Sequence, residues 1–249
     1  MDLKIRGRSA VITGASKGIG RAIAERLATE GVNVHLVART VTTLETAAAE
    51  LKDKYDVEVG FSALDLSISS NVDQLFAEYS GTIDILVNNA GAIPGGSIDR
   101  VDEATWRQAW DLKVFGYINI CRLAYNRMRD AGHGVIINVI GAAGERPSPG
   151  YIAGAGGNAS LMAITRGLGG HSLSDGIRVV AINPGLIRTE RLVTILKAQA
   201  EESVELRRNW LDHPGEPHHI ADLTAFLASE LSGNTTGTVF TVDGGSSVR

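Results

Sequence analysis

The chain is most constrained by a glycine-rich turn near its start, TGASKGIG at residues 13–20. An apolar run that predicts a strand precedes the turn, and an amphipathic pattern that predicts a helix follows it. In such a turn Gly14 lets the chain leave the strand sharply, Gly18 lets the backbone approach a pyrophosphate, and Gly20 lets the helix lie close to the sheet. The helix N-terminus adds unpaired N–H groups and a partial positive charge. In this context the turn predicts a dinucleotide-binding unit.

Apolar runs alternate with helical patterns along all 249 residues. Strands are predicted over residues 9–13, 33–38, 57–63, 83–88, 134–139, 178–183 and 238–242. Helices are predicted over residues 18–30, 41–54, 69–79, 103–130, 150–170 and 219–229. Most of the strand runs are nearly continuously apolar, which is typical of strands covered on both faces. The pattern predicts an α/β fold, a doubly wound (Rossmann-type) parallel sheet of about seven strands with helices on both faces. No linker interrupts it, so residues 1–249 are expected to form one domain.

The end of the second predicted strand indicates which dinucleotide is bound. An NAD-dependent protein of this type places an acid there to bind the ribose 2′-hydroxyl. This chain reads Val37-Ala38-Arg39-Thr40 at that point and has no acid. The guanidinium of Arg39 suits bidentate contact with a 2′-phosphate, and Lys17 in the glycine turn adds a second positive charge. The sequence therefore favours NADP(H) over NAD(H).

Composition excludes several classes of protein. The formal net charge is −4 and the basic residues are scattered, so no nucleic-acid partner is expected. No apolar run is long enough to span a bilayer and no signal-peptide pattern opens the chain, so a cytoplasmic protein without a membrane partner is expected. A single cysteine, Cys121, rules out an internal disulfide. No carboxylate or cysteine cluster accompanies His213, His218 and His219, so no metal site is expected.

Several segments resemble the short-chain dehydrogenase/reductase family in its single-domain form. Besides the glycine turn these are NNAG at residues 88–91, NPG at 183–185 followed by Thr189, and VDGG at 242–245. The resemblance covers essentially the whole chain and implies a small-molecule substrate and a homodimer or homotetramer. It places the cofactor contacts at Gly14, Ser16, Lys17, Gly18, Ile19, Gly20, Arg39, Asp65, Leu66, Asn88, Ala90, Gly91, Tyr151, Pro184, Gly185 and Thr189.

The chemistry of that family uses four side chains, and this sequence matches only one of them. A tyrosine acts as acid or base, a lysine four residues later lowers its pKa, a serine orients the carbonyl, and an asparagine on the middle helix supports a water relay. Tyr151 matches the tyrosine, but Ala155 stands at the lysine position. Gly141 stands at the serine position and Lys113 at the asparagine position. The catalytic residues are therefore predicted to be Tyr151 and Lys113, with Lys113 replacing the missing lysine.

Other interpretations of this altered site stay open. In one alternative, the protein binds the dinucleotide with little or no dehydrogenase activity, as a sensor or scaffold. In another, the role of the serine passes to a residue within Gly141–Arg146, with Glu145, Arg146 and Ser148 nearby in sequence, or to one from a later segment. That segment, residues 186–217, is long and irregular and falls at the carboxyl edge of the sheet, so it is predicted to be a substrate lid. Asn158, seven residues after Tyr151, is expected to bond a neighbouring helix rather than to take part in catalysis.

Overall fold

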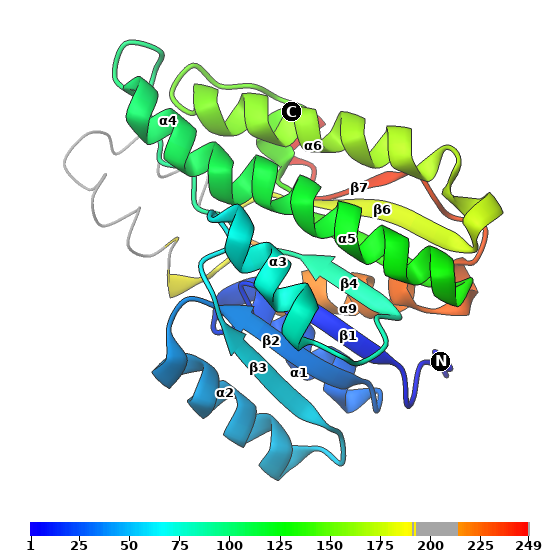
Figure 1. Cartoon of the computed structure of the whole chain (residues 1–249). Coiled ribbons are helices and arrows are strands. Elements are labelled where there is room, and N and C mark those ends of the chain that lie inside the picture. The colour runs from blue at the N-terminus through cyan, green and yellow to red at the C-terminus, as the bar shows by residue number, and fades with distance from the viewer. Residues whose placement is uncertain (191, 193–213, 249) are drawn as a thin grey trace.

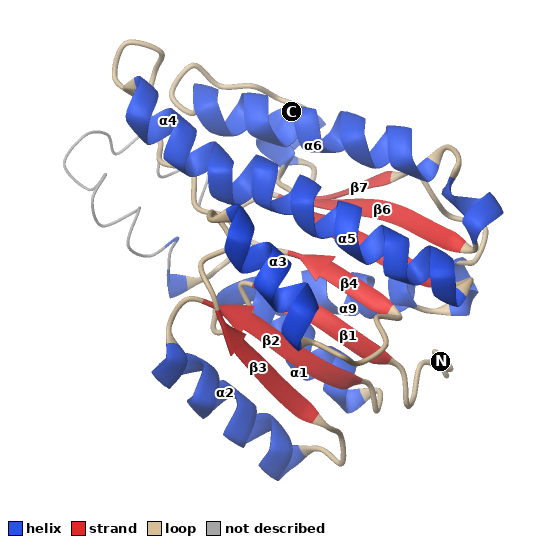
Figure 2. Cartoon of the chain, in the orientation of Figure 1, coloured by secondary structure: helices blue, strands red, loops and turns tan. Residues whose placement is uncertain are grey.

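The computed structural model describes residues 1–190, 192 and 214–248, and its centre is one sheet of seven parallel strands (Figures 1 and 2). The strand order is β3-β2-β1-β4-β5-β6-β7. The strands are β1 (Ser9–Thr13), β2 (Asn33–Ala38), β3 (Val59–Ala63), β4 (Ile85–Asn88), β5 (Gly134–Val139), β6 (Ile177–Pro184) and β7 (Val239–Val242). The α-helices are α1 (Gly18–Thr29), α2 (Val41–Lys54), α3 (Ser69–Glu78), α4 (Glu103–Trp110), α5 (Gly116–Ala131), α6 (Ile152–Gly169) and α9 (Pro217–Ala228). The predicted doubly wound fold is confirmed.

Helices cover both faces of the sheet because successive strand residues point to opposite sides. In β5, Val135 and Ile137 join the core beneath α1, α2 and α9, whereas Ile136 joins the core beneath α3 and α5. In Figure 1 α3, α5 and α6 lie in front of the sheet, while α1 and α9 lie behind it. Every residue of β4, β5 and β6 is buried, which explains why these strands have no polar alternation in the sequence.

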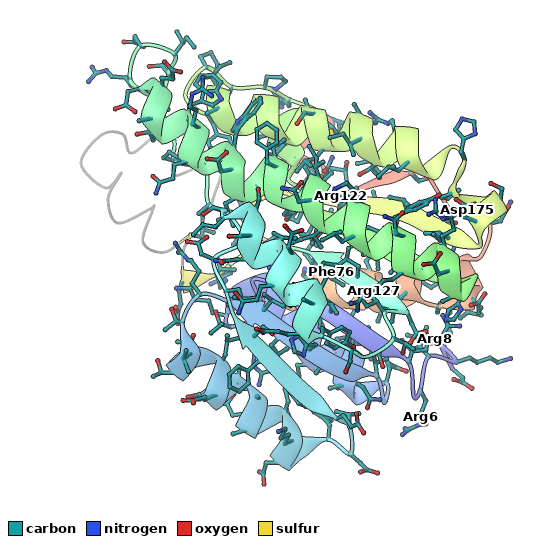
Figure 3. The ribbon with its side chains drawn as sticks, in the orientation of Figure 1. Arg6, Arg8, Phe76, Arg122, Arg127 and Asp175 are labelled. Carbon is teal, nitrogen blue, oxygen red and sulfur yellow. The ribbon has the colours of Figure 1, made fainter. Side chains whose placement is uncertain are left out.

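One cation ties the two front helices α3 and α5 together. The Arg127 guanidinium of α5 lies 5.3 Å from the centre of the Phe76 ring of α3 (Figure 3). It also donates to the carbonyl oxygens of Phe76 and Tyr79 at the C-terminal end of α3. These carbonyls have no partner within their own helix, so Arg127 both caps α3 and holds it against α5.

The predicted middle helix, residues 103–130, is interrupted by a π-helical turn. This turn, Asp111–Phe115, separates α4 from α5 and contains the buried Lys113. A π-turn inserts one extra residue into the helical register and frequently marks a functional site. Helical periodicity in the sequence does not reveal the insertion, because α4 and α5 each keep their own amphipathic pattern.

Most of the predicted lid, residues 193–213, lies outside the described residues. The two ends of the segment are joined: Ile187 forms an isolated bridge with Gly215, and the Arg188 guanidinium lies 2.8 Å from the Glu216 carboxylate. Glu216 then begins α9 with a reciprocal cap, in which its backbone N–H donates to His219 Nδ1 (3.1 Å). Among the described helices, none combines the length and apolar character needed to cross a membrane.

Candidate active site

The glycine-rich turn joins β1 to α1 at the carboxyl edge of the sheet. Gly14 has a φ of +65°, which favours glycine, and its N–H donates to the Val37 carbonyl oxygen of β2 at 2.7 Å. A Cβ atom on Gly20 would overlap the carbonyl oxygen of Gly14. The absence of a side chain at Gly20 therefore lets α1 begin directly against the turn, which aims the N–H groups of its first residues at the crevice.

The crevice lies where the strand order reverses, between β1 and β4. Thr13 and Asn89 connect the two strand ends there. The Thr13 hydroxyl oxygen accepts from the backbone N–H groups of Asn89 (2.9 Å) and Ala90 (3.0 Å). The Asn89 side chain donates to the carbonyl oxygens of Thr13 (3.1 Å) and Gly14 (3.2 Å). Neither residue was predicted as a site residue, although both lie within the quoted motifs. They hold the glycine turn and the NNAG segment in one arrangement.

Two predicted cofactor cations flank this crevice. Lys17 is exposed at the N-cap of α1, and Arg39 is exposed one residue after β2. In the part of the chain that the structure describes, neither side chain forms an ion pair. Both charges therefore remain available to an anionic ligand at the carboxyl ends of β1 and β2.

Other predicted contacts are placed differently. Asn88 is fully buried, and its side-chain amide donates to Asn138 Oδ1 (3.0 Å) and to Cys121 Sγ (3.2 Å). This side chain faces the neighbouring strand and helix instead of the crevice. Asp65, half-buried after β3, accepts from the Ser67 backbone N–H (3.0 Å) and hydroxyl (2.7 Å) and so closes its own turn. Leu66 is buried, and its carbonyl oxygen packs against Gly116 at the start of α5.

Of the later predicted contacts, Thr189 lies against the glycine turn. The methyl group of Thr189 lies 3.4 Å from the point where a Gly18 Cβ atom would stand. Pro184 ends β6, and the backbone N–H of Gly185 donates to the Val242 carbonyl oxygen at 3.0 Å. The NPG and VDGG motifs are therefore neighbours. Ser16 and Ile19 are half-buried within the turn, and Ala90 and Gly91 are half-buried in the segment beside it.

Lys113 is buried, with only 7% of its surface exposed. Its ammonium donates to the Tyr117 hydroxyl at 2.8 Å and to the Val139 carbonyl oxygen at 2.7 Å. The same Tyr117 hydroxyl donates to the Val139 carbonyl oxygen at 2.9 Å. The lysine stem crosses Gly91, where a Cβ atom would overlap its Cδ atom. A positive charge is thus held at the carboxyl end of β5, where this sheet type binds its ligands.

Tyr117 is a site residue that sequence reasoning missed. Its position four residues after Lys113, on the same helical face, was the available signal. Burial is the main cause that raises the pKa of Tyr117 well above its ordinary value. The neighbouring Cys121, in its ionised form, raises this pKa further. Burial likewise raises the pKa of Cys121 to about 12. Both groups are therefore protonated near neutral pH, and Tyr117 can donate its hydrogen bond to Val139.

Tyr151 caps the N-terminus of α6 and is half-buried beside Trp110 and Ile93. Its backbone forms an isolated bridge with Gly96, which belongs to the segment that follows β4. Its ring folds back along the helix, because a Cβ atom on Gly154 would overlap the Cε1 and Cζ atoms of the ring. Gly154 therefore leaves the space that the Tyr151 ring occupies.

Gly141, at the predicted serine position, follows β5 with a φ of +148°. A Cβ atom there would lie 2.8 Å from Asn158 Nδ2 of α6. Asn158 is 4% exposed and sits one helical turn after Gly154. The amide thus approaches the position where a serine side chain would begin. The expected contact from Asn158 to a neighbouring helix is not observed among the described residues.

The chain is similar to known proteins over almost its whole length. A family model described as enoyl-(acyl carrier protein) reductase matches residues 14–247. The 3-oxoacyl-[acyl-carrier-protein] reductase FabG of Chlamydia muridarum is 34% identical over 254 residues, covering 98% of this chain and 99% of that protein. The corresponding protein of Aquifex aeolicus is 28% identical over 251 residues, with 98% and 99% coverage.

Solved structures are similar to the chain over the same share of its length. L-Sorbose reductase from Gluconobacter frateurii, complexed with NADPH and L-sorbose, has a TM-score of 0.90 and 33% identity, covering 98% of each chain. A 7α-hydroxysteroid dehydrogenase complexed with NADH and 7-oxo glycochenodeoxycholic acid has a TM-score of 0.90 and 28% identity, covering 98% of this chain and 96% of that one. With this coverage, the strand order and the glycine turn, the chain belongs to the short-chain dehydrogenase/reductase family of oxidoreductases.

Proposed function

We propose that this protein is an NADP(H)-dependent oxidoreductase that interconverts a carbonyl compound and its alcohol, with Tyr151 as acid or base and Lys113 as the assisting cation. The observation that carries the proposal is the enclosed Lys113 ammonium at the carboxyl end of β5. Burying a lysine is costly unless its charge is used or well compensated. Here the groups that accept hydrogen bonds from the ammonium include two neutral oxygens, the Tyr117 hydroxyl and the Val139 carbonyl.

The residues around the crevice fit an NADP(H) molecule. The glycine turn leads into the N-terminus of α1, whose backbone N–H groups would bind the pyrophosphate, and the lack of a side chain at Gly18 would let the pyrophosphate approach the backbone. Lys17 and Arg39 supply exposed positive charge for a 2′-phosphate, and no acid follows β2. Structural relatives support this choice, since the G. frateurii enzyme is described with NADPH. The bound dinucleotide would supply or accept the hydride at its nicotinamide ring.

The side chains of this chain then handle the proton. Tyr151 would donate its phenolic proton to the oxygen of the carbonyl substrate as the alcohol forms, and would take that proton back in oxidation. A phenol ordinarily titrates near pH ~10, so a nearby cation is needed to stabilise the phenolate. Lys113 is proposed to be that cation. In this role Lys113 acts through its positive charge and takes no part in the proton transfer.

The second candidate is a protein that binds the dinucleotide without turnover, as a sensor or scaffold. It would account for the loss of the lysine at Ala155 and of the serine at Gly141. No contact in the described part of the chain favours it. The relatives named above are reductases or dehydrogenases, which argues against it.

The test measures binding and turnover separately. Titration of the wild-type protein with NADPH and NADH gives the two dissociation constants, and NADPH absorbance follows the reduction of acetoacetyl-CoA, L-sorbose and cyclohexanone. The first two probes reflect the substrates named for the relatives. Tight NADPH binding with turnover supports the proposal. Binding without turnover on the whole panel supports the sensor, and failure to bind NADPH contradicts both candidates.

The proposed substrate class is small molecules with a reducible carbonyl group. The relatives are named for an acyl-thioester, a sugar and a steroid substrate, which share only a reducible carbonyl group. The predicted lid is expected to set the choice, and its central residues lie outside the described ones. The homodimer or homotetramer likewise stays a prediction.

A further inference from the structure

Asn158 of α6 is a buried polar residue whose side chain lies against Gly141. The residue is 4% exposed. Among residues 1–190, 192 and 214–248, its side-chain amide makes no hydrogen bond. Other buried amides in the same region are bonded: Asn138 donates to Thr165 (3.0 Å) and Asn183 donates to Glu145 (3.0 Å). The Asn158 amide atoms are not among the fully enclosed side-chain atoms that lack a partner, so they reach accessible space where a ligand can supply the hydrogen bonds that the fold does not.

The amide is directed at a gap in the reaction site. Gly141 has no side chain, and the Asn158 Nδ2 atom lies 2.8 Å from where a Cβ atom at Gly141 would stand. The turn that follows β5 packs tightly on the same stretch of α6, since a Cβ atom on Gly144 would lie 2.7 Å from the backbone nitrogen of Ala159. The stretch of α6 that carries the amide is therefore held close to this turn by backbone packing.

The elements that meet at this amide also hold the two proposed catalytic groups. Val139, which holds the Lys113 ammonium, is two residues before Gly141 in the chain. Gly154, over which the Tyr151 ring lies, is four residues before Asn158 and on the same face of α6. The amide therefore belongs to the same edge of β5 and the same helix face as the proposed cation and the proposed acid.

We propose that the Asn158 side-chain amide donates a hydrogen bond to the carbonyl oxygen of the substrate. This inference rests on the proposed function and supplies the group that holds the carbonyl, for which Gly141 has no side chain. An amide N–H is a suitable donor because it binds the carbonyl oxygen and binds it more strongly as negative charge develops there. No bond is made or broken at Asn158, and the transferred proton still comes from Tyr151.

The experiment compares four variants in single-turnover reduction of acetoacetyl-CoA, L-sorbose and cyclohexanone by bound NADPH. Asn158→Asp keeps the size of the side chain but removes both N–H donors, and Asn158→Ala removes the amide. Ser160→Ala is the matched control on the same helix, because its hydroxyl donates to the Gly157 carbonyl oxygen within α6. Tyr151→Phe reports the proposed acid separately. NADPH affinity and the unfolding temperature are measured for each variant.

Both Asn158 variants are expected to lose ~10²–10³-fold in the rate of hydride transfer, the cost of removing one donor to a developing oxyanion. NADPH affinity should stay within about threefold of wild type. Ser160→Ala should react at the wild-type rate. Since Asn158→Asp keeps the volume of the side chain, its unfolding temperature separates a catalytic loss from a failure to fold.

Two results overturn the inference, and they are distinguishable. If wild type reacts, Tyr151→Phe does not, and the Asn158 variants react at the wild-type rate, the inference is wrong while the proposed function stands. If wild type binds NADPH but reduces none of the probes, the proposed function fails and the role of Asn158 fails with it.

Discussion

At Gly20 in the glycine-rich turn the missing side chain brings backbone against backbone, whereas at Gly91, Gly141 and Gly154 it leaves room for side chains. A Cβ atom on Gly20 would overlap the Gly14 carbonyl oxygen. In the reaction region the overlapped atoms belong to side chains instead: Lys113 at Gly91, Asn158 at Gly141 and Tyr151 at Gly154. The first kind of glycine shapes a phosphate-binding backbone, and the second kind makes space for functional groups that come from other positions.

The difference shows how the catalytic side chains of a family site can change while the glycine-rich turn that binds the dinucleotide keeps its pattern. A backbone cradle depends on glycines at set positions, so any substitution there disturbs the backbone itself. A reaction site needs only groups of the right chemistry at the right points in space. A side chain from another helix can supply such a group once the original position carries no side chain.

The largest effect is expected from Gly154→Ala. The added methyl group would collide with the Tyr151 ring and turn it away, so hydride transfer should fall about as far as in Tyr151→Phe, by ~10²–10⁴-fold. Alanine is a better helix former than glycine by up to about 1 kcal/mol, so the free energy of unfolding should not fall. Single-turnover rates and thermal unfolding check both parts. A fully active Gly154→Ala protein would show that the ring position is unimportant.

The next effect tests the proposed cation. Lys113→Met keeps most of the stem but removes the charge, and the rate of hydride transfer should fall by ~10²–10³-fold with NADPH affinity retained. Gly91→Ala is the companion variant, because its methyl group would push the lysine stem aside without changing its charge. Equal losses in both variants would show that the position of the ammonium matters as well as its presence. Unchanged turnover in Lys113→Met would contradict the proposed role.

A backbone clash should act on nucleotide binding instead. Gly20→Ala places a methyl group against the Gly14 carbonyl oxygen, so the turn must shift and NADPH affinity should fall by ~10²-fold. In contrast to Gly154→Ala, the loss should appear in the dissociation constant of NADPH measured by titration. If the two alanine variants impair the same step, the distinction between the two kinds of glycine fails.

The smallest expected effect concerns the choice of dinucleotide. Arg39→Ala should weaken NADPH binding by ~10–100-fold, the range of one charge-assisted hydrogen-bonded contact, and leave NADH binding unchanged. Lys17→Ala is the comparison, since its flexible ammonium makes a less specific contact with a phosphate. The ratio of the NADPH and NADH dissociation constants is the measurement. An unchanged ratio in Arg39→Ala would place the 2′-phosphate elsewhere.

The sequence predicted the sheet well and the reaction site only in part. The bounds of β1, β2 and β5 agree with the prediction, whereas β3 and β4 each begin two residues later than predicted. Among the extra positions, Val57 and Ile83 are apolar because they pack against the cores, so hydrophobicity alone extends the predicted strands. The cofactor roles of Asn88 and Asp65 stay predictions, although the structure bonds both side chains locally.

What the sequence determined by itself was the doubly wound fold, the glycine turn and the charge available for a 2′-phosphate, because each is written in residues close together in the chain. Only the tertiary structure decided that Lys113 bonds Val139, that Asn158 approaches Gly141, and that Tyr151 folds over Gly154. The first two contacts join different elements, and the third depends on the rotamer at the start of α6. Such contacts follow from how helices pack on the carboxyl edge of the sheet, and a linear pattern of residue types does not encode that packing.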